Sequence, residues 1–580
     1  KRDCFTTDVA NLETGASQVK FNDPVDPDFS TFTNGKYEWI ALINNPANWN
    51  YYSSDALFDS SGYNYLGATN CPGMVVASDV YVNGKWTGFK DTNWFNCGNW
   101  DTLLVPDATV DVQVGDNIFN RQATIDATAQ YAAAFGNIAT AKNLTVTGEK
   151  VEIIGNANNK LEVHGNVVIN GPAGYIDMDD SNPATADDGQ IYLYGNWINN
   201  IGSSAFDEGN GTVQFVGTGL QTISSAASVG TETFYNVILD NNFDTANSND
   251  LIALGTLTVN ATRNVNIDGT GYIIAGKKLS HYGNLTIANN GQLVQIDEFN
   301  TNDGTYGTKF QVNRTAQVKH YDYVYWGSPV KDFPVASLPN AYRFEWSTLQ
   351  PNSNGTTGNW IAPTTLTMTT GKGYIARASN GASTPQAMNL VFQGEPNNGQ
   401  FPFPINRGTY TGPDYDADPT NATNALTTKR DDNWNLLGNP YPSAIDAEKF
   451  LVLNQTKIEG TVWIWKHGLD PTASGSPFYN NYQYNYSATN DLIKYNGLGS
   501  SEPDTFAGSI ASGQGFLVAM LHSAPQPGST VTFSNDLRRG SALSASGLFD
   551  NTDFFRMSSN ASSADRPESK SRIWLDVVNV

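Results

Sequence analysis

Between about residue 107 and residue 310, short apolar segments of four to six residues alternate with polar turns, and glycine or asparagine closes each segment. A Gly-Asn entry followed closely by isoleucine begins at Gly165, Gly195 and Gly283. This pattern predicts a parallel β-solenoid in which Val, Ile and Leu stack inward and Gly or Asn takes left-handed conformations at the corners. An ordinary β-sandwich with polar turns is the alternative. The segments include 143–148, 151–155, 165–171, 195–199, 236–240, 255–260 and 283–287.

A second pattern is an internal duplication after residue 310. Two glycine-containing motifs and a following apolar strand occur twice in the same order, and such repetition indicates a duplicated module. The offsets between the copies are 111, 142 and 141 residues, so one copy carries an insertion of about thirty residues. We expect two β-sandwich-like modules, at 311–430 and 431–540. The paired segments are 326–330 with 437–441, 371–376 with 513–518, and 390–392 with 531–533.

The ends of the chain differ from these regions. Residues 1–106 mix aromatic and turn residues, with a hairpin signal at Asn83-Gly84, and are expected to form a small β-domain or cap held by tryptophan packing. Residues 541–580 are predicted to be a linker and the start of a further domain. One short helix is expected after 443–446, where Ser443 would cap it.

Composition supports an all-β fold with several domains. The chain has 580 residues, of which 39% are hydrophobic and only 15% charged, with 53 glycines. The net charge of −23 argues against nucleic-acid binding, which needs a basic face. No apolar run reaches the roughly 18 residues of a membrane helix, so no transmembrane segment is expected.

The three cysteines lie in the first hundred residues. A disulfide between Cys71 and Cys97 is the preferred pairing, which leaves Cys4 free or paired elsewhere. No Cys/His spacing fits a zinc site. The scarcity of thiols is typical of an exported protein.

The sequence contains no recognisable catalytic motif, so we expect no enzymatic activity and no catalytic residues. The five histidines are scattered singly. One acidic loop could supply the paired carboxylates that solenoid enzymes use as acid and base to cleave polysaccharides. A solvated loop is the competing interpretation. The carboxylates concerned are Asp177, Asp179, Asp180, Asp187 and Asp188.

Two further segments are candidate binding sites. The alternating carboxylates of Asp414, Asp416 and Asp418 form a possible Ca²⁺ site, although the EF-hand pattern is not met and an unliganded acidic loop is the alternative. No other cofactor is expected.

The second candidate segment is rich in tyrosine. Tyr482, Tyr484 and Tyr486 alternate, which would place them on one face of a strand. They form either a platform for sugar rings or cross-strand packing inside a sandwich.

The segment 433–446, NWNLLGNPYPSAID, closely resembles a sequence motif of large secreted surface proteins of the Bacteroidota. Those proteins leave the cell through the type IX secretion system. Segments 323–330, 371–374 and 513–516 are similar to accompanying landmarks of that group, and the resemblance covers roughly residues 94–540. It implies export, attachment to the outer-membrane surface or release, and an adhesin-like body. The sorting domain of that group is not recognisable here, and we expect the natural protein to continue beyond Val580.

From these observations we expect an extracellular or cell-surface adhesin-like or structural protein. It would meet the type IX secretion machinery during export and bind polysaccharide or another surface. Two alternatives stay open: a polysaccharide-degrading enzyme with a catalytic solenoid, and a self-assembling or secretion-associated structural protein. The sequence does not distinguish gliding motility, adhesion and nutrient capture as the role.

Overall fold

The computed structural model of the chain is nearly all β, with 43% strand and 7% helix, and contains a parallel β-solenoid of about seven turns. This confirms the predicted fold class. No helix within the described part of the chain is long and apolar enough to cross a membrane. The structure divides into two compact units, Lys1–Asn264 and Val265–Val580. It describes residues 84–552 except 102–103, 118, 156–157, 180–188, 226–231, 319–321, 351–357, 379–385, 410–414, 417–425, 428–431, 467–491, 502–505 and 543–546.

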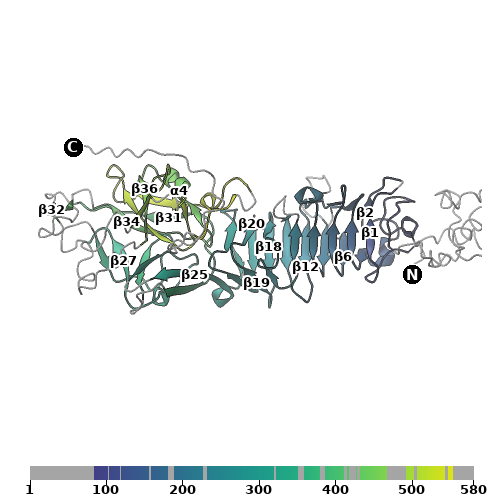
Figure 1. The fold of residues 1–580 in the computed structure, drawn as a ribbon, viewed down its shortest axis with the longest axis horizontal. Helices are drawn as coiled ribbons and strands as arrows, with labels where there is room; N and C mark the ends of the chain where they lie inside the picture. The colour runs from purple at the N-terminus through teal and green to yellow at the C-terminus, as the bar shows by residue number, and fades with distance from the viewer. Residues whose placement is uncertain are drawn as a thin grey trace, which may run out of the picture. The chain divides into compact units, whose positions relative to one another are not determined.

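The first unit is built from parallel strands stacked in turns, each turn adding strands to separate sheets (Figure 1). One eight-stranded sheet contributes six strands to this unit. In order along the stack they are β3 (Ile138–Ala141), β6 (Lys160–Val163), β9 (Gln190–Leu193), β12 (Thr212–Phe215), β15 (Asn236–Leu239) and β18 (Thr256–Val259). Leu257 pairs with Val237, twenty residues earlier, whereas Ile191 pairs with Leu161, thirty residues earlier. The turns therefore vary in length, which explains the absence of a fixed period in the sequence.

Two more sheets lie within the first unit. Alternate residues of most of their strands are buried, so apolar side chains from successive turns stack in the interior. The first of these sheets contains β1 (Val112–Val114), β4 (Leu144–Val146), β7 (Val167–Ile169), β10 (Trp197–Asn199) and β13 (Ile223–Ser225). The second contains β2 (Ala123–Ile125), β5 (Lys150–Ile153), β8 (Tyr175–Asp177) and β11 (Phe206–Asp207).

The Gly-Asn entries have a different role from the one expected. Gly165 and Gly195 are not in the left-handed region. Instead, a Cβ on Gly165 would lie 2.1 Å from Oδ1 of Asn143, and a Cβ on Gly195 would lie 2.4 Å from the backbone of Gly165. Glycine is needed there because successive turns approach closely, and the prediction of left-handed corners was wrong at these positions.

The asparagines of the same entries form a ladder along the stack. Oδ1 of Asn143 accepts from the amide of Asn166 at 2.7 Å, and Oδ1 of Asn166 accepts from the amide of Asn196 at 2.8 Å. Oδ1 of Asn196 then accepts from the amide of Thr222 at 2.8 Å. Each side chain thus satisfies a backbone donor of the next turn.

Residues 84–100 cover the beginning of the stack. The backbone of Trp86 bonds to Gln113 in β1, and that of Trp94 bonds to Thr124 in β2. Trp100 packs edge-on against both tryptophans, with ring centroids 5.1 Å from Trp86 and 4.8 Å from Trp94. This segment gives the exposed strand edges of the first turn hydrogen-bonding partners.

The second unit begins with further parallel pairs and then changes to antiparallel sheets. The long strand β25 (Phe310–Val318) marks the change, because it pairs in parallel with β22 (Asn284–Ile287) and antiparallel with β30 (Gln386–Gln393). Further parallel pairs include β20 (Tyr272–Ala275) with β23 (Gln292–Gln295) and β21 (Lys278–His281) with β24 (Asp303–Gly304).

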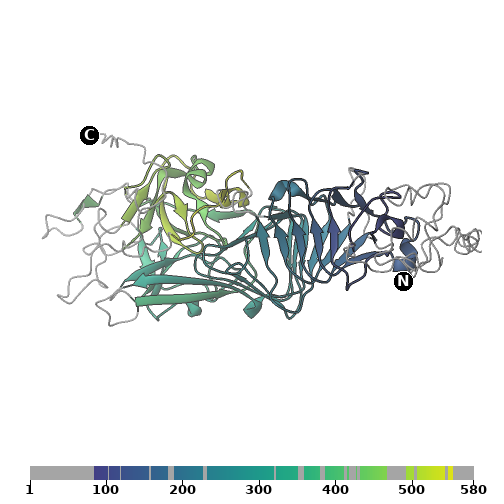
Figure 2. The same ribbon diagram turned by 45° about the vertical axis from the view of Figure 1, so that its right-hand side comes forward.

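The duplicated segments form two matching four-stranded sheets within the second unit, whose teal-green to yellow strands are drawn from a second angle in Figure 2. The first sheet has the order β26 (Tyr323–Trp326), β29 (Tyr374–Arg377), β27 (Arg343–Ser347), β28 (Asn359–Ile361). The second has the order β34 (Trp434–Gly438), β39 (Gly515–Met520), β36 (Ile458–Trp465), β37 (Leu492–Tyr495). A further strand, β31 (Phe401–Pro404), pairs with β40 (Thr530–Phe533), so the second copy uses a strand from before residue 430.

The expected helix is present as α4 (Ala447–Leu453), but its cap differs from the prediction. The side chain of Asp446, not that of Ser443, accepts from the first amides of the helix. Ser443 is buried, and its hydroxyl accepts from Nε of Arg538 at 3.0 Å. Ser443 therefore does not cap the helix, because its side chain is engaged in the tertiary contact with Arg538.

Candidate functional site

The two copies of the duplicated motif meet each other reciprocally in the second unit. The amide of Gly327 in the first copy donates to the carbonyl of Gly513 in the second at 2.7 Å. The amide of Gly438 in the second copy donates to the carbonyl of Gly371 in the first at 3.0 Å. Gly371 and Gly513 both adopt left-handed φ angles, of +83° and +70°. The duplication thus produces an approximately two-fold junction, with each motif completing the other.

Asn397 closes this junction. It is fully buried, and its side-chain amide donates to the carbonyl of Ser328 at 3.0 Å and to that of Pro440 at 2.9 Å. Ser328 and Pro440 belong to opposite copies of the motif. One side chain therefore ties both copies together through buried hydrogen bonds.

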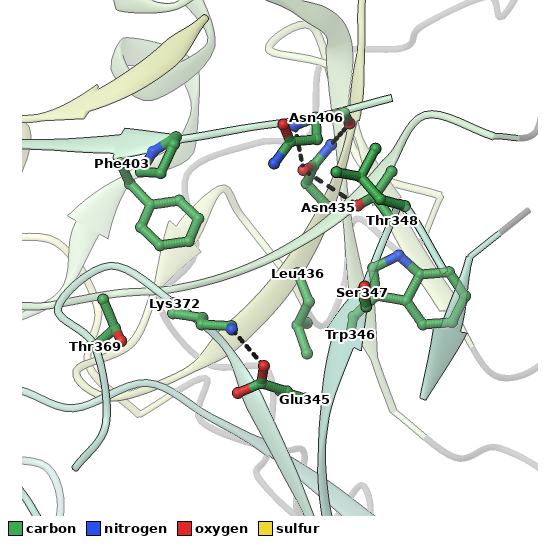
Figure 3. A pocket seen from close by; sticks show the side chains of 12 residues that line it. Glu345, Trp346, Ser347, Thr348, Thr369, Lys372, Phe403, Asn406, Asn435 and Leu436 are labelled. Carbon is green, nitrogen blue, oxygen red and sulfur yellow. Dashed lines mark hydrogen bonds and ion pairs between the residues drawn. The ribbon is translucent and has the colours of Figure 1, made fainter. Parts of the chain in front are cut away.

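A cavity of about 300 Å³ lies beside the junction, and Figure 3 shows the side chains around it. Its lining combines aromatic rings with polar groups, as small-molecule sites do, at the lower end of their usual size. Phe403 of β31 and Trp346 of β27 supply the rings. The polar groups come from Glu345, Ser347, Thr348, Thr369, Lys372, Asn406 and Asn435.

An ion pair forms one part of the wall. Nζ of Lys372 lies 2.8 Å from Oε1 of Glu345, whose side chain is only 3% exposed. Thr364 holds this carboxylate in place, because its hydroxyl donates to Oε1 at 2.9 Å. The ammonium group has three donors, and two of them make no hydrogen bond with a described residue, although the ring centroid of Tyr374 lies 5.8 Å from Nζ.

An amide network forms another part of the wall. Nδ2 of Asn435 donates to the carbonyl of Asn406 at 2.8 Å, and Oδ1 of Asn435 accepts from the amide of Asn406 at 2.9 Å. The backbone of Asn406 is therefore fixed, whereas its side-chain amide has no hydrogen-bonding partner among the described residues. Trp346 is held by its Nε1, which donates to the carbonyl of Trp434 at 2.9 Å.

The approximate two-fold relation identifies the equivalent place in the other copy. The motifs align Lys372 with Gln514, and the strand registers align Trp346 with Trp465. The full set of equivalent pairs is Glu345 with Ile464, Trp346 with Trp465, Lys372 with Gln514, Leu436 with Tyr325, and Phe403 with Arg314.

This equivalent place is filled by side chains. Tyr325 stacks on Trp465 with ring centroids 5.6 Å apart and planes 13° apart. Gln514 and Arg314 are both buried. Leu436 stands at the cavity where the other copy has the bulkier Tyr325, so the ring stack of the other copy has no counterpart there.

The predicted calcium and tyrosine sites fall largely outside the described residues. Asp414 and Asp418 lie outside them, and Asp416 lies in β32 (Tyr415–Asp416), which pairs with β33 (Leu426–Thr427). The tyrosine segment, Tyr482, Tyr484 and Tyr486, also lies outside. Among the described residues, no three His, Cys, Asp or Glu side chains are grouped in a way that could hold a metal ion.

The structure bears on the predicted disulfide at one of its two cysteines. Cys97 is buried and disulfide-bonded. Cys71 and Cys4 lie outside the described residues, so the pairing of Cys97 with Cys71 stays a prediction.

The solenoid carboxylates are placed only in part. Asp177 forms an ion pair with Lys150 at 2.7 Å, and Asp179 follows it at the surface. Asp180, Asp187 and Asp188 lie outside the described residues.

Sequence reasoning did not find the cavity. Its ion pair joins Glu345 and Lys372, which are far apart in the sequence and on different segments. One signal was present: the repeated Gly-x-Gly motif has Lys372 in the first copy and Gln514 in the second. A charge in one copy and none in the other marked one of the positions where the two modules differ.

Comparison with known proteins gives one match. No curated protein and no solved structure matches the chain significantly. A family model described as "Domain of unknown function (DUF8693)" matches residues 224–580, which is more than half of the chain. The chain therefore belongs to the DUF8693 family.

Proposed function

We propose that this chain is a non-enzymatic, adhesin-like protein of the cell surface that binds polysaccharide. The observation that carries the proposal is the duplicated pair of modules, of which one keeps an aromatic and polar cavity while the other fills the equivalent place. Binding proteins present such sites on rigid β scaffolds. Export through the type IX secretion system and an extracellular location are parts of the same proposal, supported by the sequence resemblance.

The enzymatic alternative receives less support. Of the solenoid carboxylates that lie in the described part, Asp177 is engaged by Lys150 at 2.7 Å, as a structural ion pair would be. Self-assembly through the first turn of the solenoid is also disfavoured, because residues 84–100 already occupy its strand edges.

Binding of the purified chain to a broad polysaccharide panel tests the proposal. Each polysaccharide is measured with and without EDTA, and released oligosaccharides are monitored by chromatography. Binding without products is expected. Cleavage products would establish the enzyme instead, and a defined oligomer with no polysaccharide affinity would establish the structural alternative. EDTA-sensitive binding would direct attention to Asp414, Asp416 and Asp418.

A further inference from the structure

We infer that the cavity beside the junction is the site that holds one neutral sugar ring, at the end or edge of a glycan chain. This inference rests on the proposed function and assigns it to Phe403, Ser347, Lys372 and Asn406. The shape of the cavity, its hydrogen-bonding groups and its charge support this assignment.

The shape of the cavity follows from divergence of the two modules. Where the second copy has Tyr325 stacked on Trp465, the first has Leu436 beside Trp346. Replacing a tyrosine by a leucine removes the ring that fills the equivalent place. The space beside Leu436 is open to solvent and lined by polar groups, so a ligand can enter it as it would a binding site.

The hydrogen-bonding groups around the gap suit hydroxyl groups. Lys372 keeps two donors, Asn406 keeps its side-chain amide, and Ser347 keeps its hydroxyl without partners among the described residues. Amides and hydroxyls both donate and accept, as the hydroxyl groups of a sugar do. The ring of Phe403 offers an apolar face for the C–H face of a sugar, and Leu436 adds a second apolar group to the lining.

The charges favour a neutral ligand over a uronic acid. Lys372 is neutralised by Glu345 at 2.8 Å, so the wall carries no net positive charge to attract a carboxylate. A ligand carboxylate would also approach Glu345 itself and meet like-charge repulsion. The net charge of the whole chain, −23, also disfavours the approach of an anionic ligand.

The test uses the complete chain and titrates it calorimetrically with methyl glycosides of glucose, galactose, mannose and N-acetylglucosamine, and with galacturonic acid. Leu436→Tyr places in the cavity the side chain that fills the equivalent place. Leu366→Tyr is the matched control, because Leu366 is 91% exposed and outside the cavity lining. Asn406→Ala is a second variant at a half-buried residue, and thermal unfolding checks that each variant folds.

The expected result is binding of at least one neutral glycoside by the wild type and the Leu366→Tyr protein, with at least tenfold weaker binding by Leu436→Tyr and Asn406→Ala. If the chain binds polysaccharide but folded variants bind as the wild type does, the cavity is not the site and the proposed function stands. Preference for galacturonic acid would overturn the neutral class. Absence of binding to every glycan would overturn the inference together with the proposed function.

Discussion

Gly327 and Gly438, the central glycines of the two duplicated motifs, lie back to back. A Cβ on Gly327 would be 2.7 Å from the Cα of Gly438, and a Cβ on Gly438 would be 2.5 Å from the Cα of Gly327. Neither glycine is needed for a left-handed conformation, because neither has a positive φ. The backbones of the two copies approach so closely that there is no room for a side chain on either.

This contact predicts that Gly327→Ala strongly destabilises the second unit. The new methyl group meets backbone atoms, which cannot move aside as a flexible side chain can, and overpacking of this kind costs about 1–3 kcal/mol or more. Gly460→Ala is the matched control, since a Cβ there meets nothing within 4 Å. The measurement is the midpoint of chemical denaturation. Equal midpoints for the two variants would contradict the close approach.

Asn397 gives a second prediction at the same junction. Asn397→Ala leaves the buried carbonyls of Ser328 and Pro440 without the donor that now serves both. Each unsatisfied group costs about 1–3 kcal/mol, so we expect a loss of about 3 kcal/mol in unfolding free energy. Asn389→Ala, at an exposed residue that accepts one bond from Thr315, is expected to cost far less. A comparable loss in both variants would argue against a bridging role.

Burial of His281 leads us to expect that the free energy of unfolding depends on pH. Burial lowers the pKa of His281 from 6.5 to about 4, and the ring lies 3.1 Å from the carbonyl of Thr305. Above about pH 6.5 the histidine is neutral in both states. As the pH falls toward 4 the unfolded chain binds a proton that the folded chain does not, so stability is lost, by about 3 kcal/mol over this window.

The check compares unfolding free energies of the wild type and His281→Asn between pH 7.5 and pH 4. Asparagine does not titrate, so the variant is expected to lose less stability on acidification. The carboxylates contribute equally to both curves and cancel in the comparison. Parallel curves for the two proteins would refute the assignment.

The close contact at Gly165 leads us to expect that one added methyl group there destabilises the solenoid. In Gly165→Ala the Cβ would displace Asn143, whose side chain holds the amide of Asn166 in the next turn. We expect a loss of about 2 kcal/mol or more through overpacking and the broken ladder. Gly219→Ala serves as control because its Cβ would meet nothing within 4 Å. Tryptophan fluorescence during denaturation reports the change, and an unaffected Gly165→Ala midpoint would rule out close stacking.

Much of the fold followed from local patterns. Alternating apolar positions predicted the solenoid strands, since inward residues of a strand recur every second position. Repeated motifs predicted two matching modules. The local pattern was less reliable for individual roles: Ser443 binds Arg538 while Asp446 caps the helix, and Gly165 is required for close approach of turns, not for a left-handed corner.

The sequence by itself determined the all-β class, the solenoid and the duplication, because these depend on periodicity and repetition along the chain. Only the tertiary structure decided that the two motifs complete each other at Gly327 and Gly438, and that a cavity opens beside Leu436 while Tyr325 fills its equivalent. The physical reason is that a cavity is the space left between side chains from distant segments. Its size depends on their packing in three dimensions, which no local pattern records.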